Sequence, residues 1–313
     1  MSDNEPPDRD DAPVPTHVGK YEVRKALIIT DFSDIYLARD PDLDIDVAVK
    51  RFHIKGKNTG EDAQYGEDFW RQRFLDEARV LARLDHPHIV PVLGLWDSDG
   101  DQPYFAMPFV EANLIYEVGE DEEDPDEIEE IPEKWRPKKL IVNRAVQIWT
   151  EVLSGLAHLH KRGMVHRDLK PANILLTAKR AGKVKLCDFG MIKTDDTIKD
   201  ERSGIWIGTR RYMPPEQRKS AKEVDARADV YSAGAVAFRM LTAKCPGDLP
   251  KDSDFPRTVP EDLRKLVRDC LNKKAAKRPV DAGRVLGRLQ RIKVPRVSMS
   301  PVRVVKHEAK PKA

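Results

Sequence analysis

The stretch that decides the fold is His166-Arg167-Asp168-Leu169-Lys170-Pro171-Ala172-Asn173, and Asp188-Phe189-Gly190 begins fifteen residues after its last member. An apolar helical face ends near Lys161, just before the first motif, and the strand-like run Val184–Cys187 leads into the second. Both motifs therefore follow regular elements, and together they form a specific pattern.

Outward from these motifs, the hydrophobic period changes along the chain. Strand-like runs lie at about 35–38, 47–52, 89–95 and 104–110, with one helical stretch at about 68–84. Helical patterns follow at about 145–159, 226–242, 260–272 and 281–291. A β-rich first third before a helix-rich remainder predicts an α+β fold with two lobes of different class in one chain.

The paired motifs resemble those of the protein kinase family, closest to bacterial serine/threonine kinases of the eukaryotic-like (Hanks) type. The resemblance covers about residues 18–291 and implies a small β-rich N-lobe with one long helix and a larger, mainly helical C-lobe. It also implies that Asp168 takes the proton of an acceptor hydroxyl and that Lys170 stabilises the transferring phosphoryl group. Asn173 and Asp188 would hold Mg²⁺, with Mn²⁺ as an alternative, through hard oxygen atoms.

The strand Val47-Ala48-Val49-Lys50 resembles the family's third strand. Its Lys50 would contact the ATP phosphates and pair with a carboxylate of the following helix. Glu77 is the expected partner because it lies four residues before Leu81 on the same helix face, whereas Asp76 lies about 100° away around the helix. The expected hinge runs from residue 107 to 111. The residues expected around the nucleotide are Lys50, Ile28, Ile35, Ala48, Met107, Pro108, Val110, Asn173 and Asp188.

The sequence departs from the family where a glycine-rich loop should cover the phosphates. Alignment on Phe32 and Ile35 replaces the three glycines by Ile28, Thr30 and Ser33. Glycine lets a backbone approach phosphates and aim its N–H groups at them, so this loop should bind nucleotide more weakly. Asp31 and Asp34 add negative charge there, unless their side chains point away.

The resemblance also implies supporting and regulatory residues in the second half. Glu216 should pair with a buried Arg278, and Asp229 should anchor the catalytic loop. Because Arg167 directly precedes Asp168, a phosphate on the activation segment should order that segment. Ser203 is the favoured acceptor among the hydroxyls of 188–216, whereas Thr209 is expected to hydrogen-bond near Asp168 and Lys170.

The rest of the chain suggests tails around one domain. Residues 1–17 are acidic and proline-rich, and 292–313 carry six Lys or Arg against one Glu, so both are expected to be disordered. Eleven acidic side chains in 117–133 predict a flexible surface insertion in the C-lobe, which extends to residue 291. The N-lobe spans about 18–107. No apolar run suits a membrane span and no secretory signal is visible, so a cytoplasmic protein is expected.

Three functions remain open from the sequence. The first is an ATP- and Mg²⁺-dependent serine/threonine protein kinase acting on protein hydroxyls, without an evident nucleic-acid partner, and able to phosphorylate itself as a dimer. The second is a pseudokinase that senses nucleotide or acts as a scaffold, which the glycine-less loop favours. The third is a kinase of small molecules, which the long activation segment and its PPE end at 214–216 disfavour.

Overall fold

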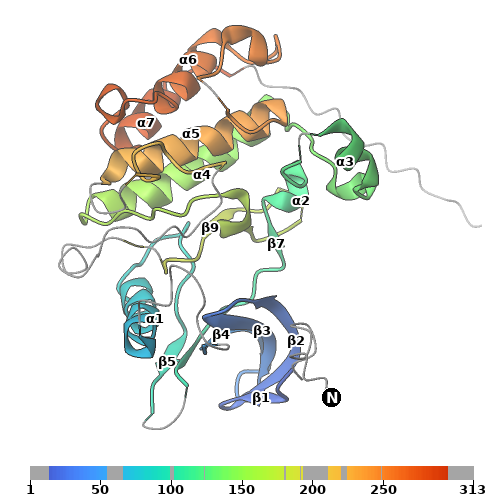
Figure 1. Ribbon diagram of the computed structural model, residues 1–313, viewed down its shortest axis with the longest axis vertical. Coiled ribbons are helices and arrows are strands. Elements are labelled where there is room, and N and C mark those ends of the chain that lie inside the picture. Colours follow the sequence, from blue (N-terminus) through green and yellow to red (C-terminus); the bar gives the residue numbers. More distant parts are fainter. Residues whose placement is uncertain are drawn as a thin grey trace, which may run out of the picture.

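The computed structural model describes residues 14–54, 66–98, 102–122, 124–179, 181–190, 192, 211–219, 224–247 and 249–294. Most of the two predicted tails, residues 1–13 of 1–17 and 295–313 of 292–313, lies outside these residues, as do Ser203 and Thr209. Within them, no helix is long and apolar enough to cross a membrane. Figure 1 shows a sheet-rich lobe and a larger helical lobe, which confirms the predicted two-lobed α+β architecture.

The N-lobe is an antiparallel sheet in the order β1-β2-β3-β4-β6-β5, with helix α1 packed beside it (Figure 1). Its elements are β1 (His17–Val18), β2 (Tyr21–Ile29), β3 (Ser33–Asp40), β4 (Ile45–Phe52), α1 (Glu67–Ala82), β5 (Gly94–Trp96) and β6 (Tyr104–Pro108). Strand β1 begins at His17, one residue before the predicted start of the domain. Helix α1 buries the predicted stripe of Trp70, Phe74, Ala78 and Leu81. That stripe attaches the helix to the sheet and orients its polar face.

The C-lobe is built on α4, which packs against α5 and α7 (Figure 1). Its helices are α2 (Ile115–Val118), α3 (Pro125–Glu130), α4 (Val142–His160), α5 (Ala226–Thr242), α6 (Glu261–Cys270) and α7 (Ala282–Leu289), with short 3-10 turns at Glu133–Trp135, Pro171–Asn173, Asp252–Asp254 and Ala275–Lys277. A small sheet, β7 (Ala112–Asn113), β8 (Ile174–Leu176) and β9 (Val184–Leu186), lies at the lobe boundary. The predicted catalytic motifs flank β8 and β9, so this sheet positions them.

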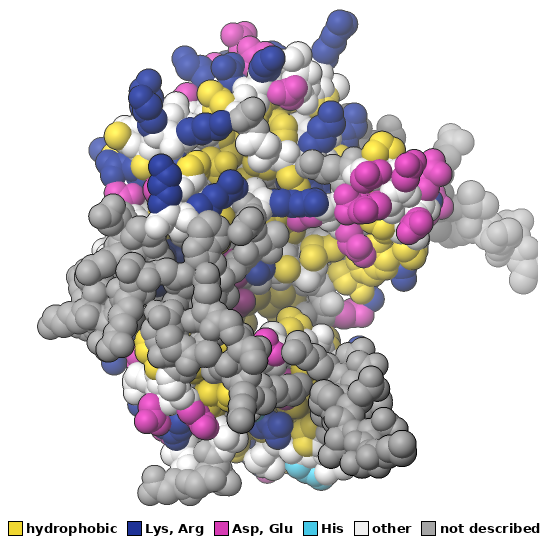
Figure 2. Space-filling view, in the orientation of Figure 1, with side chains coloured by type: hydrophobic (Ala, Val, Ile, Leu, Met, Phe, Trp, Pro, Cys, Tyr) yellow, Lys and Arg dark blue, Asp and Glu magenta, His cyan; other side chains and the backbone are white. Residues whose placement is uncertain are grey.

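The acidic segment 117–133 carries more regular structure than the sequence predicted. Helix α3 starts at Pro125, and the Asp124 carboxylate caps it by accepting the N–H of Asp126 at 2.9 Å. Asp121 accepts a hydrogen bond from buried Arg239 of α5 at 2.8 Å and another from the Tyr212 hydroxyl at 2.8 Å. These contacts fix one end of the segment to the C-lobe core, while acidic side chains gather on the surface over α3 (Figure 2).

Candidate active site

The first group of site residues joins the two lobes. Lys50 of β4 donates to both carboxylate oxygens of Glu77 on α1, at 2.9 and 2.8 Å, and its Nζ lies 3.7 Å from Asp188 Oδ1. Burial by itself would lower the pKa of Lys50, but the charges of Glu77 and Asp188 more than compensate and hold it above its ordinary value. Lys50 therefore stays charged. The structure brings together Lys50 and Glu77, as the sequence predicted, and leaves Asp76 on the exposed side of α1.

The second group lies in the loop after α4. Lys170 Nζ donates to Asp168 Oδ2 at 2.9 Å, and Asn173 Nδ2 donates to the same oxygen at 2.9 Å and to the Asp168 carbonyl at 2.8 Å. Burial raises the pKa of Asp168, with the Asp188 charge adding to the effect and Lys170 opposing it. Because Asn173 uses its amide nitrogen here, its side-chain oxygen remains as the acceptor for a metal.

Asp188 faces both groups. Its side chain is partly buried, with 44% exposed. This partial burial acts to raise its pKa, but the nearby positive charges of Lys50 and Lys170 outweigh this and keep the pKa below its ordinary value. An ionised carboxylate and an amide oxygen are the hard donors that Mg²⁺ prefers, so the residues present fit a Mg²⁺ site. Asp188 and Arg167 have left-handed backbones, with φ of 62° and 67°. Such strained positions in non-glycine residues cluster at functional sites.

Asp229 anchors the predicted catalytic loop, as expected from the sequence. This fully buried carboxylate of α5 accepts the N–H groups of His166 and Arg167 at 2.8 and 2.9 Å and a hydrogen bond from His160 at 2.8 Å. The His166 ring contacts the buried Phe189 ring at 4.9 Å between centroids. Phe189 and Leu81 of α1 belong to one core cluster that extends through both lobes. A direct contact between these two side chains stays a prediction.

The pair Glu216–Arg278 fixes the last residues of the predicted activation segment. Arg278 donates to the two carboxylate oxygens of Glu216 at 2.5 and 2.8 Å, and the Arg278 side chain is completely buried. It also lies over the Tyr231 ring at 4.8 Å. This ion pair, which the sequence predicted, ties the PPE end of the segment to the C-lobe core.

The predicted nucleotide residues of the N-lobe share one face of its sheet. Ile28 pairs with Ile35, Ile35 with Lys50, and Ala48 with Met107 across neighbouring strands. Directly opposed residues of an antiparallel sheet project to the same side. These side chains therefore lie on the face that carries Lys50.

The turn between β2 and β3 is built without glycine. The Thr30 hydroxyl accepts the N–H groups of Phe32 and Ser33 at 3.3 and 3.0 Å and donates to the Ser33 carbonyl at 2.7 Å. Thr30 thus provides an acceptor within the turn for two of its amides. Asp34 does not add charge to the cleft, because its carboxylate is buried and bonded to His53 at 2.8 Å and to the Tyr36 hydroxyl at 2.7 Å.

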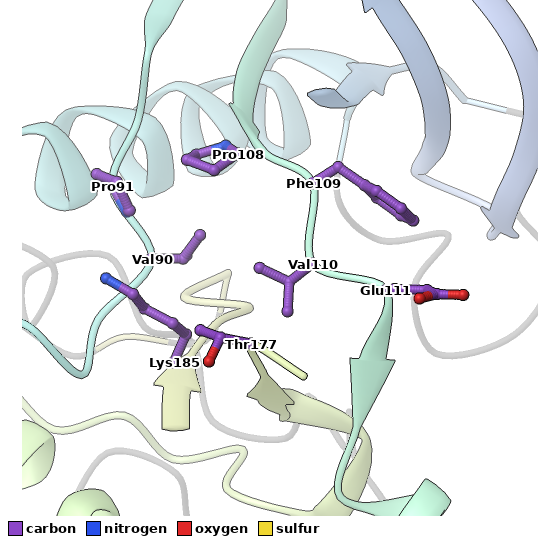
Figure 3. A pocket seen from close by; sticks show the side chains of 8 residues that line it. All are labelled: Val90, Pro91, Pro108, Phe109, Val110, Glu111, Thr177 and Lys185. Atoms are coloured by element: carbon purple, nitrogen blue, oxygen red, sulfur yellow. The ribbon is translucent and has the colours of Figure 1, made fainter. Parts of the chain in front are cut away.

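The hinge borders a cavity of about 540 Å³ in which the side chain of Val110 faces Thr177 and Lys185 (Figure 3). Pro108 also lines it, but Lys50, Asp168 and Asp188 do not. This cavity therefore involves only Pro108 and Val110 of the expected nucleotide residues.

Comparison with known proteins agrees with this geometry. A family model described as "Protein kinase domain" matches residues 21–286. The chain belongs to the protein kinase family. The DNA damage-responsive serine/threonine-protein kinase RqkA of Deinococcus radiodurans is 32% identical over 278 residues, covering 83% of this chain and 38% of RqkA. Serine/threonine-protein kinase PknB of Mycobacterium tuberculosis is 33% identical over 244 residues, covering 75% of this chain and 35% of PknB.

Among solved structures, the kinase domain of PknI from Mycobacterium tuberculosis matches with a TM-score of 0.61 and 25% identity, covering 89% of this chain and 98% of that domain. The chain spans only about a third of the length of the curated relatives named above, at 38% and 35%. The similarity therefore concerns their kinase domains.

The sequence did not predict two contacts of α1. Phe32 of the β2–β3 turn stacks on Trp70, and Arg73 donates to the carbonyl of Gly190 at 2.9 Å. Trp70 was identified as part of a buried stripe, but nothing in its spacing indicates that its partner lies 38 positions earlier in the chain.

Proposed function

We propose that this protein is a serine/threonine protein kinase that transfers the γ-phosphoryl group of ATP to hydroxyls of protein substrates. The observation that carries the proposal is the placement of Asp168, held by Lys170 and Asn173, beside the Lys50–Asp188 pair. This arrangement provides a proton acceptor, two cations and two oxygen ligands at one place. Phosphoryl transfer depends mainly on such positioning and on charge neutralisation.

In this reaction the acceptor hydroxyl oxygen attacks the γ-phosphorus while the bond to the β–γ bridging oxygen breaks and ADP leaves. Asp168 orients the hydroxyl and takes its proton, and Lys170 neutralises charge on the transferred group. Lys50, fixed by Glu77, contacts the α- and β-phosphates. Asn173 and Asp188 would hold the Mg²⁺ ions, with Mn²⁺ as an alternative, and the metal supplies charge neutralisation for the phosphate oxygens.

The choice of serine and threonine as acceptors rests on Lys170, two residues after Asp168, and on the names of the related kinases. We further propose that the protein phosphorylates itself within a dimer, on the activation segment, with Ser203 as the favoured acceptor. Thr209 is instead proposed to form hydrogen bonds near Asp168. Residence in the cytoplasm remains a prediction.

Transfer of labelled phosphate to a generic protein substrate tests this function, with Asp168→Asn as the control. The wild type should label the substrate on Ser or Thr, and the variant should lose at least two orders of magnitude in rate, typical for loss of a general base. Mass spectrometry should find phosphate on the wild-type activation segment and none on the variant. Equal labelling by the two proteins would contradict the proposal.

A pseudokinase that only binds nucleotide is the second candidate, and one observation favours it. The amides that a glycine-rich loop would offer to phosphates are used by Thr30. A thermal shift with Mg-ATP separates the candidates, because ligand at 100 times its Kd stabilises a protein by about 2.7 kcal/mol. A shift without phosphate transfer would favour the pseudokinase.

A further inference from the structure

The tip of the β2–β3 turn is attached to helix α1 by an aromatic stack. The Phe32 and Trp70 rings lie 4.2 Å apart between centroids at 26°. Trp70 is buried, at 6% exposure, and Phe32 packs against the same core. A ring stacked on a buried partner has a defined geometry, so this contact fixes the turn relative to the first half of the helix.

Strand β4 holds the same turn from its other side. The Phe32 carbonyl accepts the N–H of His53 at 3.2 Å, and His53 Nε2 pairs with Asp34 Oδ1 at 2.8 Å. The two residues that flank Ser33 are therefore tied to the end of the strand that also carries Lys50. In this arrangement the turn cannot move independently of β4 or of α1.

Helix α1 in turn contacts the predicted site at two points. Glu77 holds Lys50, and Arg73 donates to the carbonyl of Gly190, two residues after Asp188. A displacement of α1 would change both contacts. The Phe32–Trp70 stack is therefore connected to the cleft through one rigid element, although neither ring contacts Lys50 or Asp188 in any described interaction.

We propose that Trp70 is a positioning residue for phosphoryl transfer. Through its contact with Phe32, Trp70 fixes the glycine-less turn, β4 and α1 relative to one another. The Glu77–Lys50 ion pair is thereby maintained, although the turn does not bind the phosphates as a glycine-rich loop would. In this chain the turn stabilises the position of α1 instead of binding the phosphates of the nucleotide. The inference rests on the proposed kinase function for its kinetic consequences, and its structural part can be measured without activity.

The kinetic test compares Trp70→Leu, which removes the stack, with Trp70→Phe, which keeps an aromatic ring. If the full free energy of an aromatic pair is lost from the transition state, the rate falls about 3- to 10-fold. Trp70→Leu should lower kcat by that factor and leave the KM for ATP within about twofold, and Trp70→Phe should recover most of the loss. A raised KM with unchanged kcat, or no rescue by Trp70→Phe, would overturn the proposal.

Trp96→Leu is the matched control. Trp96 stacks on Tyr104 at 5.1 Å and 13° in the same sheet, but against a core cluster that includes neither Phe32 nor Trp70. It should leave kcat unchanged. The double variant Phe32→Leu/Trp70→Leu should be no slower than Trp70→Leu alone, because the two residues act as one contact. Multiplied losses would show that they act separately and would refute the coupling.

Hydrogen exchange of the 313-residue chain separates this proposal from the kinase function. Phe32→Leu should speed amide exchange in residues 67–82 several-fold, and Trp96→Leu should not. If the wild type transfers no phosphate but this exchange response appears, the kinase function fails and the coupling stands. If Phe32→Leu leaves exchange in α1 unchanged, the coupling fails, whether or not the protein is active. Phe32→Leu also serves if Trp70→Leu does not fold.

Discussion

Replacing Thr30 by glycine should tighten nucleotide binding while it destabilises the protein. The variant removes the hydroxyl that accepts the N–H groups of Phe32 and Ser33 and that donates to the Ser33 carbonyl. Both amides then become available to the phosphates of ATP. The glycine also permits the closer backbone approach that a β-carbon prevents.

The magnitude follows from two opposing contributions. Each new hydrogen bond from an amide to a charged phosphate contributes about 1.5–3 kcal/mol, and so two contribute about 3–6 kcal/mol. Ordering two freed residues on binding costs about 2–4 kcal/mol. The difference of roughly 1.5 kcal/mol corresponds to about tenfold tighter binding. The free energy of unfolding should meanwhile fall by about 1–2 kcal/mol, because hydrogen bonds within the turn are lost.

Isothermal titration with Mg²⁺ and a non-hydrolysable ATP analogue measures the affinity, and urea denaturation measures the stability. Thr177→Gly is the matched control, since the Thr177 hydroxyl also accepts a turn amide, that of Lys183 at 2.9 Å, in the β8–β9 hairpin. Thr177→Gly should lose stability without gaining affinity. If Thr30→Gly binds the analogue no more tightly than the wild type, the captured amides are not what limits binding, and the reasoning is refuted.

Three further predictions concern buried charges. Arg278→Met should lower the free energy of unfolding in urea by about 3–5 kcal/mol because it strands Glu216, whereas Arg288→Met, in an ion pair that leaves Arg288 43% exposed, should cost less than about 1 kcal/mol. Equal losses would contradict this. Burial acts to raise the pKa of Asp229, but hydrogen bonds from His160 and from backbone amides hold it below the unfolded value of about 3.9. Its ionised form therefore stabilises the fold above about pH 4, and this stability disappears as the pH falls through the folded-state pKa, so urea midpoints should fall more steeply below pH 4 for the wild type than for Asp229→Asn. Lys50→Met should slow phosphate transfer about 100- to 1,000-fold in a protein that still folds, and a rate near that of the wild type would remove Lys50 from the proposed mechanism.

The parts of the site that the sequence predicted are those encoded by local spacing. Asp168, Lys170 and Asn173 lie within six positions, so one loop brings them together, and its shape follows from the motif. Glu77 could be separated from Asp76 because the helical period fixes which side chain faces the sheet. In both cases short-range geometry limits where the side chain can point.

Long-range contacts could not be predicted in this way. Arg239 is a buried arginine in the last turn of α5, and its partner Asp121 lies 118 positions earlier in a segment whose composition alone predicts a solvated loop. The buried guanidinium of Arg239 requires an anion and carbonyl groups around it, and this requirement fixes part of the acidic segment against the C-lobe core. The net charge of a segment does not indicate whether a distant buried cation will pair with one of its carboxylates.

The loss of the loop glycines affects binding and catalysis differently. The sequence suggested two defects, missing phosphate contacts and added negative charge from Asp31 and Asp34. The structure removes the contribution of Asp34, because its carboxylate is buried between His53 and Tyr36, whereas Asp31 is exposed in the turn. The missing phosphate contacts remain, because the Thr30 hydroxyl binds the turn amides. This defect affects only atoms that would contact the phosphates, and the Lys50–Glu77 pair stays in place. Weak phosphate contacts with an intact reacting centre should raise the KM for ATP more than they lower kcat. We therefore expect a kcat within the usual range of protein kinases together with a high KM for ATP. A low KM for ATP with a kcat near zero would contradict this. It would mean that the turn still binds the phosphates and that the reacting centre is inactive.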